Sequence, residues 1–221
     1  MSGSKKRESG FLVGHILRYV QMYAPKFKQC IVFTTYDRST KGFYPAAFVL
    51  CTSRRYEMYF HAIRLILDAT DYAMDPEFTY CDLEAGLIRA IREHFPDTSP
   101  IACLFHFKQA CWRKMKKYRI LEKECNIAMK QGVLDMLTVI PQEKVKKKVM
   151  AWVKSKIEDK CELAGIKYSE IKWGHYWKYF NRTWIIIFPP NLWNVAPFTR
   201  DLLSRTNNPV ERFNHEMNGF Y

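Results

Sequence analysis

Residues 77–105 have the sequence EFTYCDLEAGLIRAIREHFPDTSPIACLF. The aromatic and β-branched side chains at 77–81 predict a short strand that leads directly into Asp82. Apolar residues then repeat at helical spacing, and the helix that they predict is expected to end before Pro96. The apolar run at 101–105 predicts a second buried strand. A strand–helix–strand unit of this kind places two parallel strands in one sheet, with the helix on a face of the sheet.

A hairpin and a helix are expected on the N-terminal side of this unit. Residues 29–36 and 43–52 are rich in β-branched and aromatic side chains, and the turn-forming segment DRSTKG separates them. Pro45 is expected at an edge or near the beginning of its strand. Residues 54–71 have apolar side chains at helical spacing and predict a helix on the hairpin. Residues 11–23 fit either a short strand or a short helix.

Only helices are expected on the C-terminal side. Residues 106–118 predict a basic helix, and residues 120–180 predict further helices without strands. One of these spans about 142–163, with Gly165 as its C-terminal cap. The aromatic and proline-rich residues 181–200 indicate a returning loop.

This order of elements predicts an α/β protein with a mixed sheet, in which antiparallel strands come first and parallel strands follow. RNase H-like nucleases and integrases have the same order. We therefore expect an RNase H-like mixed sheet with a helical insertion before the last helix. The expected divisions are a disordered N-terminus, the first part of the core, the basic insertion with its returning loop, and the truncated start of a C-terminal helix, at residues 1–10, 11–118, 119–200 and 201–221.

The positive charge is concentrated inside the chain. The net charge is +13, and the segment from Lys108 to Lys178 holds 18 Lys and Arg against 8 Asp and Glu. Such a concentration suits a polyanion, namely duplex DNA, RNA or an anionic membrane surface. The alternative is a lysine-rich helical surface that is simply solvated.

Composition bounds the compartment and the type of core. Hydrophobic residues make up 48% of the chain, which is enough to fill a core. No run of 18 apolar residues occurs and the first residues lack the apolar region of a signal peptide, so we expect a soluble intracellular protein that does not enter a membrane. The seven scattered cysteines are expected to be reduced and mostly buried.

Two acidic residues are candidates for metal chemistry. Asp82 ends a strand, where α/β sheets place ligand sites, although an Asp at the start of a helix also serves as an N-cap. Glu211 lies in RTNNPVERFNHEMN, whose many hydrogen-bonding side chains suit either a site that gathers phosphate groups or a solvent-exposed cap with Pro209 in the first turn. Carboxylates from different elements are the usual means of holding the two metal ions that cleave a phosphodiester.

Cys103 and His106 have the C-x2-H spacing of half a zinc site. Because no second pair at comparable spacing follows, the sequence favours a buried cysteine and a histidine at the sheet edge over tetrahedral zinc.

Several segments together resemble one family. The stretch TYCDLEAGLIRAIREHFPDTSPIACLFHFKQACWRKM resembles the signature of Mutator-like element (MULE) transposase domains, which belong to the RNase H-like DDE superfamily. The stretch PKFKQCIVFTTYDRSTKGFYPAAFVLCTSRRYEMY is similar to the early strands of that family. The WNV and RTNNPVERFNHEMN segments are similar to its final block, so the resemblance runs in order over about residues 23–221.

The resemblance implies a nuclear transposase core that cleaves and transfers DNA strands at terminal inverted repeats with Mg²⁺ or Mn²⁺. It implies that Asp82 is the second catalytic acid and metal ligand, that Glu211 is the third, and that Cys103 and His106 are the family's C-x-x-H pair. DNA and copies of the chain itself are the expected partners. The side chains expected to hold DNA are Lys108, Arg113, Lys116, Lys117, Lys144, Lys147, Lys148 and Lys154.

The sequence departs from the family at the first acid. The family's first Asp precedes a Pro-x-Phe-x-Gln motif, which is Pro25–Gln29 here, and Arg18 lies near the expected position. A cation at that place would oppose the binding of Mg²⁺. Three hypotheses follow: a transposase core, active or decayed; a domesticated DNA-binding protein without catalysis; and a structural or protein-interaction domain.

Overall fold

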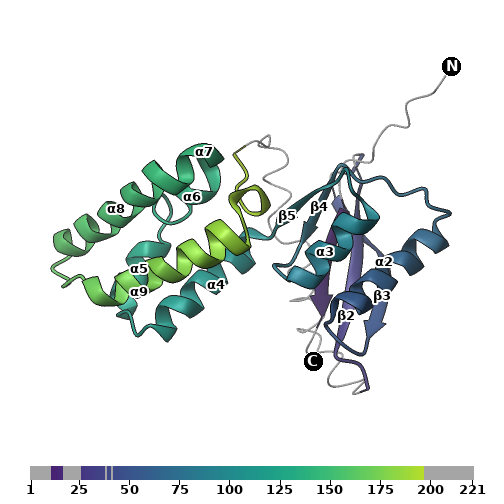
Figure 1. Ribbon diagram of the computed structural model, residues 1–221, viewed down its shortest axis with the longest axis horizontal. Coiled ribbons are helices and arrows are strands. Elements are labelled where there is room, and N and C mark those ends of the chain that lie inside the picture. The colour runs from purple at the N-terminus through teal and green to yellow at the C-terminus, as the bar shows by residue number, and fades with distance from the viewer. Residues whose placement is uncertain (1–10, 17–25, 38, 41, 197–221) are drawn as a thin grey trace. The chain divides into compact units, whose positions relative to one another are not determined.

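The computed structural model describes residues 11–16, 26–37, 39–40 and 42–196 (Figure 1). The chain divides into two compact units, with the boundary between Cys103 and Leu104. We call the described residues up to Cys103 the sheet unit and the described residues from Leu104 to Ala196 the helical unit.

The sheet unit has a five-stranded mixed sheet in the order β3-β2-β1-β4-β5. Its strands are β1 (Phe11–Ile16), β2 (Gln29–Asp37), β3 (Gly42–Cys51), β4 (Phe78–Cys81) and β5 (Ser99–Ala102). The pairs β1–β2 and β2–β3 are antiparallel, whereas β1–β4 and β4–β5 are parallel. The predicted hairpin, the mixed sheet and the antiparallel-then-parallel order are therefore confirmed.

The edge strand shows where Pro45 lies, and the central strand shows that the first element is a strand and not a helix. Pro45 lies in β3 at the edge of the sheet, where the ladder tolerates a residue without an N–H group. The register of β2 and β3 shifts between Phe33 and Thr34, opposite this proline. The first element is a strand over residues 11–16 and occupies the centre of the sheet.

Two helices cover one face of this sheet, α2 (Tyr56–Ala69) and α3 (Ala85–His94) (Figure 1). Each buries one apolar stripe, as the helical spacing predicts. The two helices pack against each other where α3 begins. At Gly86 an added Cβ would lie 3.2 Å from the backbone nitrogen of Tyr56, so a side chain here would push the two helices slightly apart.

The helical unit consists of helices only, as predicted. Its elements are α4 (Leu104–Lys117), α5 (Glu122–Met129), α6 (Met136–Val139), α7 (Gln142–Lys144), the π-helix η1 (Val145–Val149), α8 (Met150–Leu163), α9 (Glu170–Phe180), the π-helix η2 (Asn181–Ile187) and the 3₁₀ turn η3 (Pro190–Leu192). α4 belongs to the helical unit, because the boundary between the two compact units precedes Leu104. The sequence pattern instead groups residues 106–118 with the sheet.

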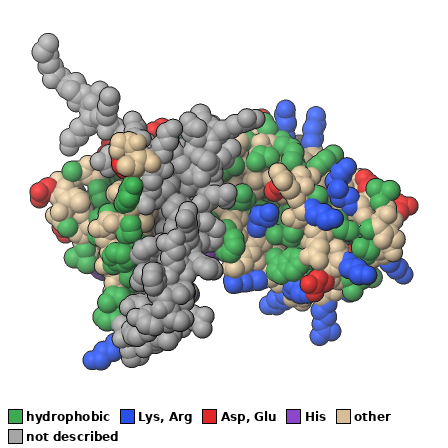
Figure 2. Space-filling model, turned by 180° about the vertical axis from the view of Figure 1, so that it is seen from behind, with side chains coloured by type: hydrophobic (Ala, Val, Ile, Leu, Met, Phe, Trp, Pro, Cys, Tyr) green, Lys and Arg blue, Asp and Glu red, His purple; other side chains and the backbone are tan. Residues whose placement is uncertain are grey.

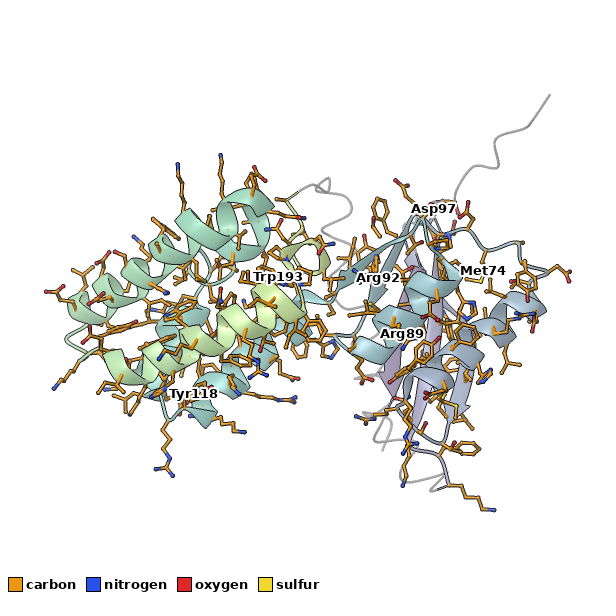
Figure 3. The ribbon with its side chains drawn as sticks, viewed as in Figure 1. Met74, Arg89, Arg92, Asp97, Tyr118 and Trp193 are labelled. Atoms are coloured by element: carbon orange, nitrogen blue, oxygen red, sulfur yellow. The ribbon has the colours of Figure 1, made fainter. Side chains whose placement is uncertain are left out.

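Aromatic side chains form the core of the helical unit. The ring of Phe107 on α4 stacks on Trp193, which is labelled in Figure 3, with the centroids 5.0 Å apart. The ring of Trp184 meets Phe107 edge-on, with the centroids 4.8 Å apart. All three side chains are buried. Because large rings bury much apolar area, these contacts hold α4 against the segment that follows α9.

A buried carboxylate joins α5 to α9. Glu124 is fully buried and accepts hydrogen bonds from the Ser169 N–H group at 2.8 Å and from the indole N–H of Trp173 at 3.0 Å. The Glu124 carboxylate also accepts hydrogen bonds from the Ser169 hydroxyl and, at 3.2 Å, from the Leu121 N–H group. Ser169 is the N-cap residue of α9, so the charge is paired with donors at a helix N-terminus.

Two predictions for the later part of the chain have different outcomes. The helix expected at 142–163 is formed by α7, η1 and α8 and ends at Leu163; Gly165 follows two residues later with a φ of +64°, the conformation that the predicted cap requires. The returning loop expected at 181–200 is wrong in its first part. Residues 181–187 continue α9 as a π-helix because Trp184 turns into the aromatic core.

Within the part of the chain that the structure describes, no helix has both the length and the apolar character needed to cross a bilayer. The N-terminus expected to be disordered (1–10) and the helix expected to start in 201–221 both lie outside the described residues.

Candidate functional site

The carboxyl ends of three parallel strands meet at one edge of the sheet. β1, β4 and β5 run in the same direction, so Ile16, Cys81 and Ala102 all end at this edge. β2 is antiparallel to β1 and begins there with Gln29. We call this the strand-end edge; in parallel sheets it is where ligands bind.

Asp82 lies directly after β4 at the strand-end edge and is half-buried. Its carbonyl oxygen accepts the Glu84 N–H group at 2.8 Å, which closes a tight turn before α3. The N-cap residue of α3 is Glu84, so the N-cap interpretation of Asp82 is wrong. The turn leaves Asp82 between the end of β4 and the start of α3, as the sequence predicts for a ligand position.

A buried hydrogen-bond network holds this turn. The hydroxyl of Tyr59, which is fully buried in α2, donates to the carboxylate of Glu84 and lies 3.4 Å from Oε1 of Gln29. Nε2 of Gln29 donates in turn to the carbonyl of Ser53, just after β3, at 3.1 Å. The network ties α2, β2 and the end of β3 to the residue two places after Asp82.

The network also fixes the protonation of its tyrosine. Burial, followed by the hydrogen bond to Glu84, raises the pKa of Tyr59 far above its ordinary value. The hydroxyl therefore stays protonated and remains a donor to the Glu84 carboxylate. Glu84 thus points to Tyr59 and acts as an anchor of the turn.

The first strand brings no carboxylate to this place. Val13 of β1 pairs with Cys81, and continuing the parallel register sets Gly14 level with Asp82. Residues 11–16 read FLVGHI and contain no Asp or Glu. Arg18, which lies near the position of the family's first acid, is outside the described residues.

The C-x-x-H pair follows β5. Cys103 is half-buried with a free thiol, and its N–H group donates to the Cys81 carbonyl at 3.1 Å. His106 is half-buried in the first turns of α4. No group of three or more His, Cys, Asp or Glu side chains in the described part of the chain could hold a metal ion.

The thiol beside Asp82 is kept neutral. Cys81 is buried, and desolvation raises its pKa strongly, with the nearby Asp82 carboxylate and Cys103 acting in the same direction. In the metal-free chain the Cys81 thiol therefore stays protonated and packs as a small buried apolar side chain.

The basic residues predicted to hold DNA lie in the helical unit, where Lys and Arg side chains are spread over the surface (Figure 2). Exposed side chains are those of Arg113, Lys116, Lys117, Lys144 and Lys148, and half-buried ones are those of Lys108 and Lys154. The Nζ atom of Lys116 lies 3.0 Å from the Glu122 carboxylate, and that of Lys154 lies 5.4 Å from the Trp177 ring centroid. Lys147 belongs to η1, and its side chain is outside the described residues.

The second proposed acid also lies outside the described residues. Glu211 and its neighbours Arg205, Asn207, Asn208 and Asn214 belong to that part of the chain. The site that the structure describes is therefore the Asp82 side of the strand-end edge. The sequence does not predict the hydrogen-bond network of Tyr59, Glu84 and Gln29 that supports this site. Its one local signal is the Asp-x-Glu spacing at Asp82 and Glu84.

Comparison with known protein families identifies one match. Residues 24–110 match the family model described as "MULE transposase domain". This range contains β2 through β5 and reaches into α4, so it includes Asp82, Cys103 and His106. A search of curated proteins finds no match for the chain.

Proposed function

We propose that this chain, in which residues 24–110 match the MULE transposase domain model, is the catalytic core of a DNA transposase with an RNase H-like fold. The family match supports a transposase-related function. The sheet supports the fold assignment, because its antiparallel strands precede its parallel strands as they do in RNase H-like nucleases and integrases.

Asp82 is the observation that carries the proposal. It follows β4 at the strand-end edge, inside the matched range, and the Tyr59–Glu84 hydrogen bond holds its turn. In the proposed assignment Asp82 and Glu211 are the two acids that bind Mg²⁺ or Mn²⁺. Carboxylate oxygens are the ligands that these ions prefer.

The metal, when bound, would supply an activated water and stabilise the leaving oxygen of the phosphodiester. The residues of the chain would do the rest. Asp82 would fix the position of the ion, while Tyr59 and Glu84 keep its turn rigid. The cations of the helical unit would hold the DNA through its phosphates, which contributes affinity without reading the sequence.

The remaining parts of the proposal concern the setting of the reaction. We propose that the protein acts in the nucleus on the terminal inverted repeats of a transposon. Both ends of a transposon have to be held during strand transfer, so copies of the chain are proposed to assemble on DNA.

A second candidate function is DNA binding without catalysis, as in a domesticated or decayed transposase. The observation that favours it is the strand beside Asp82, since residues 11–16 contain no carboxylate and Gly14 is level with Asp82. It predicts salt-sensitive DNA binding that needs no divalent metal.

Nicking of supercoiled plasmid DNA by the full chain, with Mg²⁺, with Mn²⁺ or with EDTA, separates the two functions. We expect metal-dependent nicking that falls to background in Asp82→Asn and in Glu211→Gln. Asp97→Asn is the matched control, because Asp97 precedes β5 and therefore lies at the end of the strands opposite the strand-end edge (Figure 3). Nicking that survives both substitutions would sink the proposed roles, and metal-independent binding without nicking would establish the second function.

A further inference from the structure

Two segments of the helical unit are basic and contain no acidic residues. Residues 104–121 contain six Lys and Arg and no Asp or Glu, and residues 171–187 contain three and again no acid. The helices within these segments, α4 and α9, pack against each other. The cations are Lys108, Arg113, Lys114, Lys116, Lys117, Arg119, Lys172, Lys178 and Arg182.

Aromatic rings lie among these cations. The Nζ atom of Lys114 on α4 lies 4.2 Å from the ring centroid of Tyr179 and 5.2 Å from that of Tyr118. The ring of Tyr118 is inclined by 24° to that of His175, and their centroids are 6.2 Å apart. The centroids of the Tyr118 and Tyr179 rings are 6.5 Å apart. We call Lys114, Tyr118, His175, Lys178 and Tyr179 the ring–cation face.

This face reaches solvent. His175 and Lys178 are exposed, and Lys114, Tyr118 and Tyr179 are half-buried. Lys178 and Tyr179 lie three and four residues after His175 in α9, so both are neighbours of His175 on the helix surface. Tyr118 lies just beyond the last residue of α4, on the outside of the unit (Figure 3).

Packing alone does not account for an exposed ring at position 175. The core of the unit already has its own aromatic residues, including Trp173, Tyr176 and Phe180 of the same helix, all buried. His175 buries no comparable area, yet its ring is almost parallel to that of Tyr118. An exposed ring beside cations, on two segments without acidic residues, is the arrangement that binds unpaired nucleic acid, in which bases stack on rings while cations contact the phosphates.

We propose that the ring–cation face binds an unpaired segment of DNA. The inference rests on the proposed function, since it assigns to the helical unit a form of the DNA that the transposase would handle. Unpaired DNA fits better than duplex DNA because the bases of a duplex are stacked on each other and offer no free ring surface. Lys178 near the end of α9 and Arg182 in η2, four residues later, contact the phosphates that follow the stacked base.

Fluorescence anisotropy with the full chain tests this proposal, using labelled oligo(dT) and a blunt duplex of the same length. We expect His175→Ala to weaken binding of oligo(dT) by about fivefold or more, since stacking on one ring is worth this much per base. We expect His175→Trp, which enlarges the ring, to tighten it. Binding to the duplex should change much less in both variants. Unchanged far-UV circular dichroism will show that the exposed-site variants remain folded.

The salt dependence provides the second readout. Lys178→Ala should reduce the slope of log K against log salt for oligo(dT) by about 0.7, the value for one phosphate contact in a single strand. The matched control is Lys130→Ala, which removes an exposed cation that borders the groove between α5 and α8. That control should leave the slope for oligo(dT) unchanged.

Three outcomes would overturn the proposal. They are unchanged affinity of His175→Ala for oligo(dT), an equal loss of affinity for oligo(dT) and duplex, and an equal effect of Lys130→Ala and Lys178→Ala on the slope. If these occur while Asp82-dependent nicking persists, only the ring–cation face is refuted. If the unaltered chain binds neither probe, the DNA-acting function itself is refuted.

Discussion

Replacement of Glu124 by alanine is predicted to destabilise the helical unit strongly. Its carboxylate is fully buried and accepts four hydrogen bonds, from Leu121, from Trp173 and from the N–H and hydroxyl groups of Ser169. Alanine leaves the buried indole N–H of Trp173 and the amide at the start of α9 without an acceptor. Removing one side of such a buried charged cluster costs about 3–5 kcal/mol. That is a large share of the roughly 5–15 kcal/mol that stabilises a typical domain.

Urea unfolding followed by tryptophan emission measures this cost in the right part of the chain. All six tryptophans lie between positions 112 and 193, inside the helical unit, so the signal reports on that unit alone. Glu124→Gln keeps an acceptor oxygen but turns an amide toward donors, and should lose about 1–3 kcal/mol.

The matched control is Glu122→Ala, two residues earlier in α5. Glu122 is exposed and pairs only at the surface with Lys116, so its loss should cost at most about 1 kcal/mol. If Glu124→Ala unfolds within about 1 kcal/mol of the unaltered chain, the reasoning on the buried carboxylate is refuted.

Three further predictions concern the sheet unit. Tyr59→Phe removes the buried donor to Glu84 and should lower the free energy of unfolding by about 1–3 kcal/mol; hydrogen exchange of the amides at the start of α3 should show faster opening. Hydrogen bonds from the side chains of the β2–β3 turn lower the pKa of Asp37 to about 2, so Asp37→Ala should destabilise the hairpin at neutral pH. The difference in stability between Asp37→Ala and the unaltered chain should vanish as the pH falls from about 4 through 2, because a carboxyl group with a lowered pKa stabilises the folded state only while it is ionised. Amide exchange in the hairpin, measured against pH, checks this; a difference that stays constant with pH would contradict it. Gly86→Val should overpack the contact with Tyr56 and cost about 1–3 kcal/mol, and unchanged amide protection in α2 and α3 would contradict that.

Local sequence patterns predicted the elements well where one pattern dominates. The β-branched and aromatic side chains of residues 29–36 and 43–52 favour strands, and the helical spacing in 54–71 reflects the one buried face of α2, so the hairpin and α2 follow directly. The segment 181–187 shows the limit. Its aromatic and proline-rich surroundings indicate a loop, but burial of Trp184 in the aromatic core continues the helix.

Long-range pairing explains what sequence patterns missed at the site. The position of Asp82 follows from the strand and helix around it, but its role as an N-cap was wrong because the backbone turn to Glu84 precedes the helix. Tyr59 and Glu84 are 25 residues apart, and Glu124 is 45 residues from Ser169. No local periodicity shows that a particular apolar-face tyrosine or helix-start glutamate has such a partner.

The distance of bound Mn²⁺ from individual amides tests the metal site most directly. Mn²⁺ broadens NMR signals of nearby nuclei, so a titration of the isotope-labelled full chain reports where the ion binds. We predict that the amides of Asp82, Cys103 and Gly14 broaden first, since all lie at the strand-end edge, and that Asp82→Asn abolishes the effect. Asp97, at the opposite edge, should keep its signal. Broadening centred on Asp97, or broadening that persists in Asp82→Asn, would contradict the assignment of Asp82 as a metal ligand.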